Sequence, residues 1–501
     1  MKMNKYYKTL QDFSINFIYI FAAIIFSIFF ITSLFITTKI PDREFPEYIL
    51  FNYSWIFFFI LQILIVFLII RYNKKINSDY LFLILAGIFL IYGMYIILNI
   101  NNELRADAEV VWQGAIDFSN NSNYLFLKGR YFDFYPHQLG LLHYERLIMG
   151  LLGTNPRILF TINLLQVISI NYILYRIVDL ISNKNHIMNL LSIILSFLFL
   201  PQFYFIVFAY GLINGLFFAI ISIYFLVKYQ KNKKVFSIFL SATFISIACL
   251  LRNNYIILFL AIVIYLIFIN YKHYKKMAFI FTITFFMLSK LFTYSINSMT
   301  ENKTGNKFTN GAPKQLWIAM GTDPENWNLG PGWYNGYVRD VISSVNYDYD
   351  KAKIIGNQKI KQNIKHFIFN PVDAVNYFTI KIASTWLEPS FQSFWTGPQK
   401  SYKQITENKI ISSIYNQGNL YKLNFNFMKA NLVLSYAAIA FYLWKYRNKE
   451  FTIFILYFLG GFIFHIFWET KAQYVYPYIY LILPIVAASV KNVFSDKKSV
   501  I

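Results

Sequence analysis

Apolar stretches of about 20 residues recur along most of this 501-residue chain. A helix needs about 20 apolar residues to cross the hydrocarbon core of a bilayer, so the repetition predicts a helical protein that crosses a membrane many times. The first stretch is too long for the apolar part of a cleaved signal peptide, so it counts as a span. Twelve stretches qualify: 15–38, 48–70, 80–100, 157–179, 187–206, 211–228, 235–251, 254–270, 277–295, 427–445, 452–468 and 474–490.

The composition agrees with this interpretation. Charged residues make up 14% of the chain and hydrophobic residues 57%. A soluble enzyme has about a quarter of its residues charged, and a disordered chain has too little apolar surface to resemble this one. The single cysteine, Cys249, excludes a disulfide framework and a cysteine-based metal site. The net charge of +22 is the one feature that suggests nucleic acid.

The distribution of the positive charge gives it another meaning. Lysine and arginine concentrate in the short gaps that share a side with the N-terminus, for example at Lys74, Lys75, Lys184, Lys231, Lys233, Lys234, Lys275, Lys276, Arg447 and Lys449. This alternation is the positive-inside pattern of membrane proteins, and it predicts that both termini are cytoplasmic. We therefore expect a multi-pass protein of the cell membrane, with no nucleic-acid partner.

Two long segments fall on the opposite, extracytoplasmic side. The sequence thus predicts an all-α polytopic membrane protein with about 12 transmembrane helices and two large outer loops that carry short interfacial helices. The expected regions are 1–295, a transmembrane region that includes the first outer loop 101–156; 296–426, a large extracytoplasmic loop region; and 427–501, a C-terminal transmembrane region. The predicted interfacial helices lie near 110–116 and 371–387. Ionisable residues are scarce within the spans, which argues against an ion-coupled carrier.

The first outer loop begins with two acids. Asp107 and Glu109 follow the third span closely, just beyond the expected edge of the membrane. A carboxylate at this boundary can act as a general base on a hydroxyl group if the electrophile arrives in the plane of the lipid. The alternative is that both acids are solvated, or that they stabilise the N-terminus of the following helix through its dipole.

The pattern around these acids resembles the GT-C superfamily of membrane glycosyltransferases. An Asp-x-Glu after an outward-going helix, then Trp112, then Tyr135-Pro136 is similar to bacterial members related to the protein O-mannosyltransferases and the lipid A aminoarabinose transferases. The sequence departs from them because Ala108 separates the acids and because the loop follows the third span. The resemblance implies a GT-C-like fold, with Asp107 as catalytic base and Glu109 in support.

The same resemblance implies basic residues that hold the phosphate of a lipid-linked donor. Arg252 lies between the seventh and eighth spans, and Lys471 lies in the tight hairpin before the last span. Arg105, just before the acids, is the third candidate. Alternatively, Arg252 extends to the interface along its apolar stem, and the hairpin belongs to an interfacial aromatic belt.

Several polar and aromatic residues are candidates for binding substrate. The stretch 330–337 combines glycines with Trp333 and tyrosines, and aromatic faces suit the C–H faces of a pyranose; aromatic packing is the alternative. The predicted substrate-binding residues are Tyr135, His137, Gln138, Trp333, Glu469 and Tyr474. No cofactor is certain. Asp348 and Asp350 offer oxygen ligands that a divalent cation can use, but one Asp-x-Asp is a weak signal, and a solvated loop is the favoured interpretation.

The resemblance implies an inverting hexosyltransferase that takes a sugar from a polyprenyl-phosphate donor. Its expected partners are that donor, membrane lipids, and a cell-envelope glycan, lipid or protein acceptor. Soluble nucleotide sugars are generally absent on the outer face, which is why a lipid carrier is expected. Two alternatives remain open: a polysaccharide polymerase or ligase, and a transporter or flippase for envelope lipids.

Overall fold

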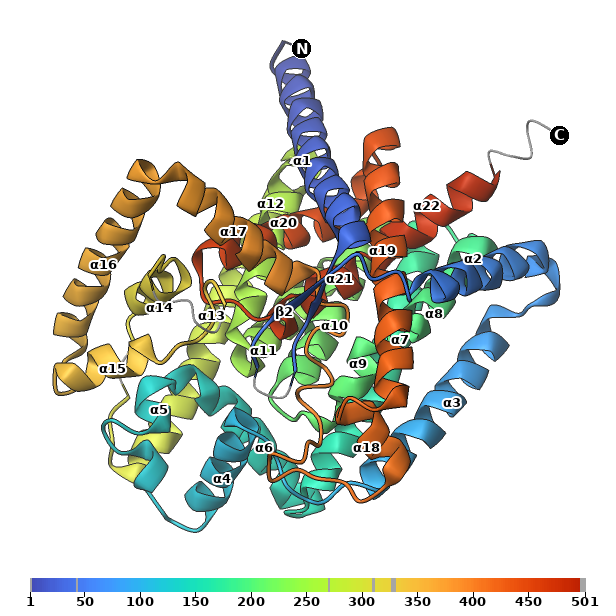
Figure 1. Ribbon diagram of the computed structural model, residues 1–501. Helices are drawn as coiled ribbons and strands as arrows, with labels where there is room; N and C mark the ends of the chain where they lie inside the picture. The colour runs from blue at the N-terminus through green and yellow to red at the C-terminus, as the bar shows by residue number, and fades with distance from the viewer. Residues whose placement is uncertain (1, 42–43, 269–270, 309–310, 326–329, 496–501) are drawn as a thin grey trace.

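The computed structural model describes residues 2–41, 44–268, 271–308, 311–325 and 330–495. Nearly all secondary structure in these ranges is helical (Figure 1). The last two residues of the predicted span 254–270 and the last six of the predicted region 427–501 lie outside the described residues.

Seven described helices are long and apolar enough to cross a membrane: α1 (Lys2–Phe35), α3 (Ser78–Leu98), α7 (Pro156–Ile181), α10 (Leu212–Asn232), α13 (Tyr271–Thr304), α19 (Asn419–Lys445) and α20 (Thr452–Phe467) with the preceding turn η6 (Lys449–Phe451). By the length and composition of its helices, the protein is an all-α multi-pass membrane protein. This part of the prediction is confirmed.

Two bent helix pairs raise the number of possible spans to nine. The first joins α8 (His186–Leu198) to α9 (Pro201–Tyr204) and η4 (Phe205–Val207) at 45°; the second joins α21 (Ala472–Leu481) to α22 (Leu483–Ser495) at 47°. Proline at the start of α9 explains the first bend, because it lacks the N–H that would continue the preceding helix.

The three remaining predicted spans are not confirmed. They coincide with shorter apolar helices: α2 (Ile56–Arg71), α11 (Val235–Leu251), and η5 (Asn253–Tyr255) followed by α12 (Ile256–Phe268). Their apolar character is as predicted, but a helix of 16 or 17 residues is shorter than the usual bilayer thickness requires. The predicted total of twelve spans stays a prediction.

The two long segments between apolar helices are themselves largely helical. The first carries α4 (Asp107–Ser119), η2 (Tyr124–Phe126), α5 (Tyr131–Phe134), η3 (Pro136–Gln138) and α6 (Leu139–Leu152). The second carries α14 (Lys314–Gly321), α15 (Tyr337–Ser344), α16 (Tyr349–Phe369), α17 (Pro371–Trp386) and α18 (Lys409–Tyr415). The helices predicted near 110–116 and 371–387 are confirmed as α4 and α17. In Figure 1, α4 and α6 lie at the end of the molecule opposite to both chain termini.

A β-hairpin replaces helix where two predicted spans were expected to end and begin. β1 (Ile36–Lys39) pairs antiparallel with β2 (Glu47–Leu50), and Lys39 lies opposite Glu47. The β-branched run Ile36-Thr37-Thr38 favours strand over helix, and the Thr38 hydroxyl donates a hydrogen bond to the carbonyl of Ala383 at 2.9 Å. The predicted limits 38 and 48 were therefore wrong.

The predicted limits of the large loop also fall inside helices. α13 continues to Thr304, beyond the expected end at 295, and α19 begins at Asn419, before the expected start at 427. Hydropathy marks only the apolar part of a helix, whereas the backbone hydrogen bonds continue through polar residues at either end. The hairpin, the start of α4, η3 and the turn before α21 come together in the region described next.

Candidate active site

Asp107 is the first residue of α4. The residue before it, Ala106, has φ of 52° and ψ of −134°, a backbone conformation that residues with a Cβ rarely adopt. No side chain caps this helix end. Strained backbone of this kind persists only where the surrounding structure imposes it, and it is common at functional sites. The strain here lies directly next to the predicted base.

The carboxylate of Asp107 is exposed, but protein surrounds it closely. Desolvation raises the pKa of this carboxyl group; Lys471 and a hydrogen bond from Tyr210 lower it, Glu44 raises it, and Arg252 lowers it. The side chain is therefore accessible to solvent although many protein atoms lie around it. An accessible carboxylate with a raised pKa is suited to accept a proton from a hydroxyl group.

Lys471 forms an ion pair with Glu44, with 2.7 Å between Nζ and Oε1. Burial lowers the pKa of the Lys471 ammonium, but Glu44, Glu469 and Asp107 more than compensate, so its pKa is raised and it stays charged. The side-chain amide of Gln392 donates to the same Glu44 oxygen at 3.2 Å. Sequence analysis did not single out Glu44, because it lies in the hairpin between β1 and β2, far along the chain from Lys471.

Glu469 is a buried acid whose carboxyl group feels the charges of Asp107, Lys471 and Glu44. We call this group of side chains, with the residues that contact it, the Asp107 cluster. Burial raises its pKa to about 7; Lys471 lowers it and Glu44 raises it. The hydroxyl of Tyr474 donates a hydrogen bond to Oε1 of Glu469 at 3.3 Å. Two predicted substrate-binding residues, Glu469 and Tyr474, are therefore direct partners, and Glu469 changes charge close to neutral pH.

Arg252 lies at the C-terminal end of α11, in the short connection to η5. Its Nη1 donates to the carbonyl of Tyr210 at 3.1 Å, and its guanidinium lies 5.3 Å from the Tyr210 ring and 5.5 Å from the Tyr474 ring. No carboxylate among the described residues is within ion-pair distance of Arg252. Its charge acts on the pKa of both Asp107 and His137. The guanidinium of Arg252 can therefore bind an anionic group of a ligand.

The predicted residues of η3 and its approach also belong to the cluster. Gln138 donates to the hydroxyl of Tyr210 at 2.9 Å. Desolvation and the charge of Arg252 lower the pKa of His137 to about 4, so this exposed imidazole is neutral at pH 7 and can both donate and accept a hydrogen bond. The ring of Tyr135 lies 6.1 Å from that of His137.

Glu109, the predicted supporting acid, points elsewhere. Residues two apart on a helix project about 200° from each other, so Asp107 and Glu109 cannot share one face of α4. Glu109 forms an ion pair with Lys403, in the segment between α17 and α18. This ion pair connects α4 to the segment between α17 and α18.

Arg105, a predicted phosphate ligand, is buried. Its guanidinium donates to the carbonyl of Gly397 at 2.8 Å and to Oε1 of Gln399 at 3.2 Å. The rings of Trp395 and Tyr402 lie 4.2 Å and 3.6 Å from it. These contacts make Arg105 the anchor that holds the 395–402 segment against the start of α4.

Trp333, the predicted sugar-stacking residue, is only 2% exposed. Its indole N–H donates to the Ser384 hydroxyl at 3.1 Å, and its ring packs with other buried side chains. A ring in this position has no open face. Two other rings of this aromatic region, Trp317 and Tyr334, are partly exposed and lie 6.3 Å apart, and the Trp317 ring is 6.1 Å from Tyr135.

The acids Asp348 and Asp350 have a local structural role. Asp348 caps α16 by accepting a hydrogen bond from the backbone N–H of Lys351 at 3.0 Å, and it forms an ion pair with the Lys351 side chain at 3.4 Å. Asp350 lies in the first turn of the same helix. Within the described ranges, no three His, Cys, Asp or Glu side chains are grouped so that they could hold a metal ion.

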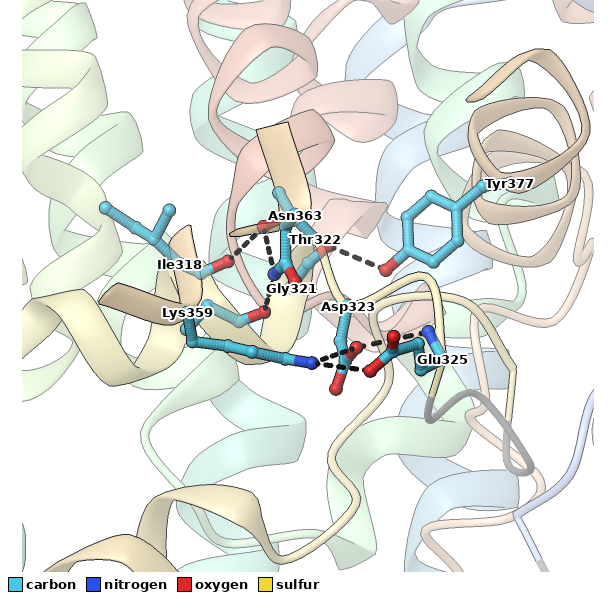
Figure 2. A network of polar contacts seen from close by, with 9 residues as sticks. Ile318, Gly321, Thr322, Asp323, Glu325, Lys359, Asn363 and Tyr377 are labelled. Atoms are coloured by element: carbon cyan, nitrogen blue, oxygen red, sulfur yellow. Dashed lines mark hydrogen bonds and ion pairs between the residues drawn. The ribbon is translucent and has the colours of Figure 1, made fainter. Parts of the chain in front are cut away.

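A second polar network joins α14, α16, α17 and the turn after α14 (Figure 2). Lys359 on α16 pairs with Asp323 at 3.1 Å and with Glu325 at 3.0 Å. The Asn363 amide donates to the carbonyl of Ala319 at 2.9 Å, and the Tyr377 hydroxyl donates to the carbonyl of Gly321 at 3.0 Å. The network thereby fixes the C-terminal end of α14.

That end of α14 supports the segment that carries Glu469 and Lys471. A Cβ on Gly321 would collide with the backbone of Trp468 and Glu469, so only glycine permits this approach. The buried ammonium of Lys381 donates to the carbonyls of Gly321, Ile466 and Trp468. The scaffold therefore sets the position of the 468–471 turn relative to Asp107.

Comparison with models of protein families gives no match, and a search of curated proteins gives none either. The chemistry of the cluster is therefore argued from its geometry. An accessible carboxylate, two cations and several tyrosine and tryptophan rings are gathered from distant parts of the chain. Such an arrangement can remove a proton from a hydroxyl group, and it can stabilise a leaving group that carries negative charge.

Proposed function

We propose that this protein is a membrane glycosyltransferase that moves a sugar from a polyprenyl-phosphate donor to a hydroxyl group of a cell-envelope glycan, lipid or protein. The observation that carries the proposal is the exposed yet desolvated carboxylate of Asp107 beside Lys471 and Arg252. Arg252 and Lys471 lie at the ends of apolar helices, α11 and α21. The phosphate of a lipid-linked donor lies at the same level, because headgroups lie where apolar helices end.

In the proposed reaction, the acceptor oxygen attacks the anomeric carbon from the side opposite the phosphate. The bond between the anomeric carbon and the phosphate oxygen breaks, and its electron pair leaves with the phosphate. Asp107 takes the proton of the acceptor hydroxyl, and the configuration at the anomeric carbon inverts. Lys471 and Arg252 stabilise the negative charge on the departing phosphate. The raised pKa makes Asp107 a stronger base than an ordinary aspartate.

The other members of the cluster would bind the sugar and the acceptor. Neutral His137 and the Glu469–Tyr474 pair offer hydrogen bonds, and Tyr135 with the neighbouring Trp317 and Tyr334 offers aromatic faces. We assign Arg105 and Trp333 to the support of the site, because both are buried in protein contacts.

The proposed topology places this cluster on the extracytoplasmic side. Twelve spans would put both termini in the cytoplasm, where the basic gaps between spans belong according to the positive-inside rule. Shorter helices such as α2 and α11 would then cross a bilayer that is locally thinner, or rely on flanking residues that extend to its surface.

The test incubates the purified protein in liposomes with a radiolabelled polyprenyl-phosphate sugar and an extract of envelope acceptors. We expect label on an acceptor in the wild type. Asp107→Asn should reduce transfer about 1,000-fold, within the range that a general base contributes, because asparagine cannot take the proton. Glu109→Gln is the matched control on the same helix; it should keep most of the activity, since Glu109 pairs with Lys403.

Three results would count against the proposal. Full transfer by Asp107→Asn would remove the assigned base. Movement of the labelled lipid across the vesicle without cleavage of its bond to the sugar would indicate a flippase. Growth of a long polymer from lipid-linked units would indicate a polymerase. A parallel reaction with EDTA measures whether a divalent cation is required beside Lys471 and Arg252.

A further inference from the structure

We infer a second binding site, for the headgroup phosphate of an anionic phospholipid, in a cleft between α4, α6 and the end of α13. The cleft has a volume of about 960 Å³, and its lining includes Ile116 of α4, Arg146, Leu147 and Leu151 of α6, and Lys303 of α13. None of these residues belongs to the cluster around Asp107. The inference stands without the proposed transfer reaction.

Two cations share one aromatic ring at this cleft. The guanidinium of Arg146 lies 4.9 Å from the centre of the Phe118 ring, and the ammonium of Lys303 lies 4.5 Å from it. The only hydrogen-bond acceptor described for Arg146 is the sulfur of Met299, at 3.5 Å. No carboxylate among the described residues forms an ion pair with either cation. Both cations line the same cleft, so an anion bound in it would lie in the positive field of both.

Of the three acids near the cleft, one is buried and two accept hydrogen bonds from uncharged groups. Glu145 is buried, and burial raises its pKa well above the usual range, which favours its uncharged form. The carboxylate of Asp117 accepts a hydrogen bond from Gln113 at 2.8 Å, and that of Glu301 accepts one from the backbone of Phe308 at 3.1 Å. Burial and the charge of Arg146 lower the pKa of His143 to about 4, so this side chain is neutral as well.

The rim of the cleft is apolar and lies where a membrane surface is expected. Leu147 is 61% exposed and Leu151 is 74% exposed. α13 contains a candidate membrane span that ends at Thr304, one residue after Lys303. A cation pair beside exposed leucines at the end of a span matches a phospholipid, whose phosphate contacts the cations while an acyl chain covers the leucines. A soluble phosphate ion would make no use of the leucines.

The walls of the cleft are held together by polar contacts. His143 Nε2 and the Thr300 hydroxyl are 2.8 Å apart, which joins α6 to α13. The Asn123 amide donates to the carbonyl of Thr304 at 3.2 Å, which joins the turn after α4 to the same helix. Because these contacts already hold the helices around the cleft in place, little conformational entropy is lost when a ligand binds, and this favours affinity.

The experiment measures lipid bound to the full-length protein. Purified protein is equilibrated in detergent micelles with equal amounts of phosphatidylglycerol and phosphatidylcholine, and the lipids that remain bound are quantified by native mass spectrometry. We expect phosphatidylglycerol to be preferred. Arg146→Gln and Lys303→Gln should each lower its binding about fivefold, as expected for the loss of one cation near a lipid phosphate. Lys353→Gln, which removes an exposed lysine of α16, is the matched control and should change nothing.

A second comparison separates a lipid site from a site for any anion. Leu151→Gln should weaken phosphatidylglycerol binding, because it removes apolar surface that covers the acyl chain while it leaves both cations and the net charge in place. Inorganic phosphate should fail to displace the lipid at equal concentration. Equal retention of phosphatidylglycerol by the Arg146→Gln, Lys303→Gln double variant would overturn the site. Full displacement by inorganic phosphate would overturn its assignment to a lipid. Thermal unfolding of each variant verifies that it is folded.

Discussion

The cluster around Asp107 and the network around Lys359 are both rich in charge, but they are built differently. In the network of Figure 2, Lys359 pairs with Asp323 and Glu325, so acids and base are matched within the protein. In the Asp107 cluster, Lys471 pairs with Glu44, while Asp107 stays exposed and has a raised pKa. In the same cluster, the guanidinium of Arg252 donates a hydrogen bond to the backbone carbonyl of Tyr210 rather than to a carboxylate.

This difference separates a scaffold from a reactive site. Charges that satisfy one another keep segments together and have little capacity left for a ligand. A desolvated carboxylate beside cations that are only partly neutralised is costly to maintain, and proteins place such groups where chemistry or binding requires them. Substitutions in the Asp107 cluster should therefore change the rate of sugar transfer. Substitutions in the Lys359 network should change the free energy of unfolding.

After the loss of Asp107 itself, the largest effect on rate is expected from Arg252→Gln. The change removes a cation that stabilises the departing phosphate, and one lost electrostatic contact of this kind lowers kcat by about 100-fold. Arg252→Lys should restore part of the rate, since it keeps the charge but loses the two-pronged geometry. Initial rates of sugar transfer measure the effect. Unchanged kcat in Arg252→Gln would place this residue outside the reaction.

A stability effect is expected from Asp323→Asn. The change removes the charge of the buried Asp323 and leaves the half-buried ammonium of Lys359 with one carboxylate partner in place of two, so the free energy of unfolding should fall by about 2 kcal/mol. The melting temperature in detergent should drop, whereas transfer per folded molecule at a permissive temperature should stay near the wild-type value. A lower rate with unchanged stability would mean that the network takes part in the reaction.

The smallest effect, a shift of the pH profile, is expected from Glu44→Gln. Transfer should fall at low pH as Asp107 gains a proton. The negative charge of Glu44 raises the pKa of Asp107, so its removal should lower that pKa and move the acid limb to lower pH. Rates measured from pH 4 to 8 would reveal the shift. Glu325→Gln is the control and should leave the pH–rate profile unchanged. If the acid limb of the Glu44→Gln profile moved to higher pH, Glu44 could not be raising the pKa of Asp107.

The sequence predicted part of the candidate site. It singled out Asp107, Arg252 and Lys471, and the structure brings all three together. It did not indicate Glu44, because this glutamate is one of several charged residues in a short gap between apolar stretches and forms no recognisable pattern with them. It also offered no means to distinguish Arg105 and Trp333, which are buried, from neighbours that remain exposed. Burial depends on what packs against a residue, and local sequence does not contain that information.

Helicity and apolar spans are what the sequence determined by itself. Within a membrane every backbone N–H and C=O needs a partner in its own segment, so a long apolar stretch has one solution, the helix, wherever it lies in the chain. The tertiary structure decided the charges and the accessibility of the site. Residues 44, 107, 252 and 471 are far apart in sequence, and their pKa values depend on distances and desolvation that arise only when the helices pack together.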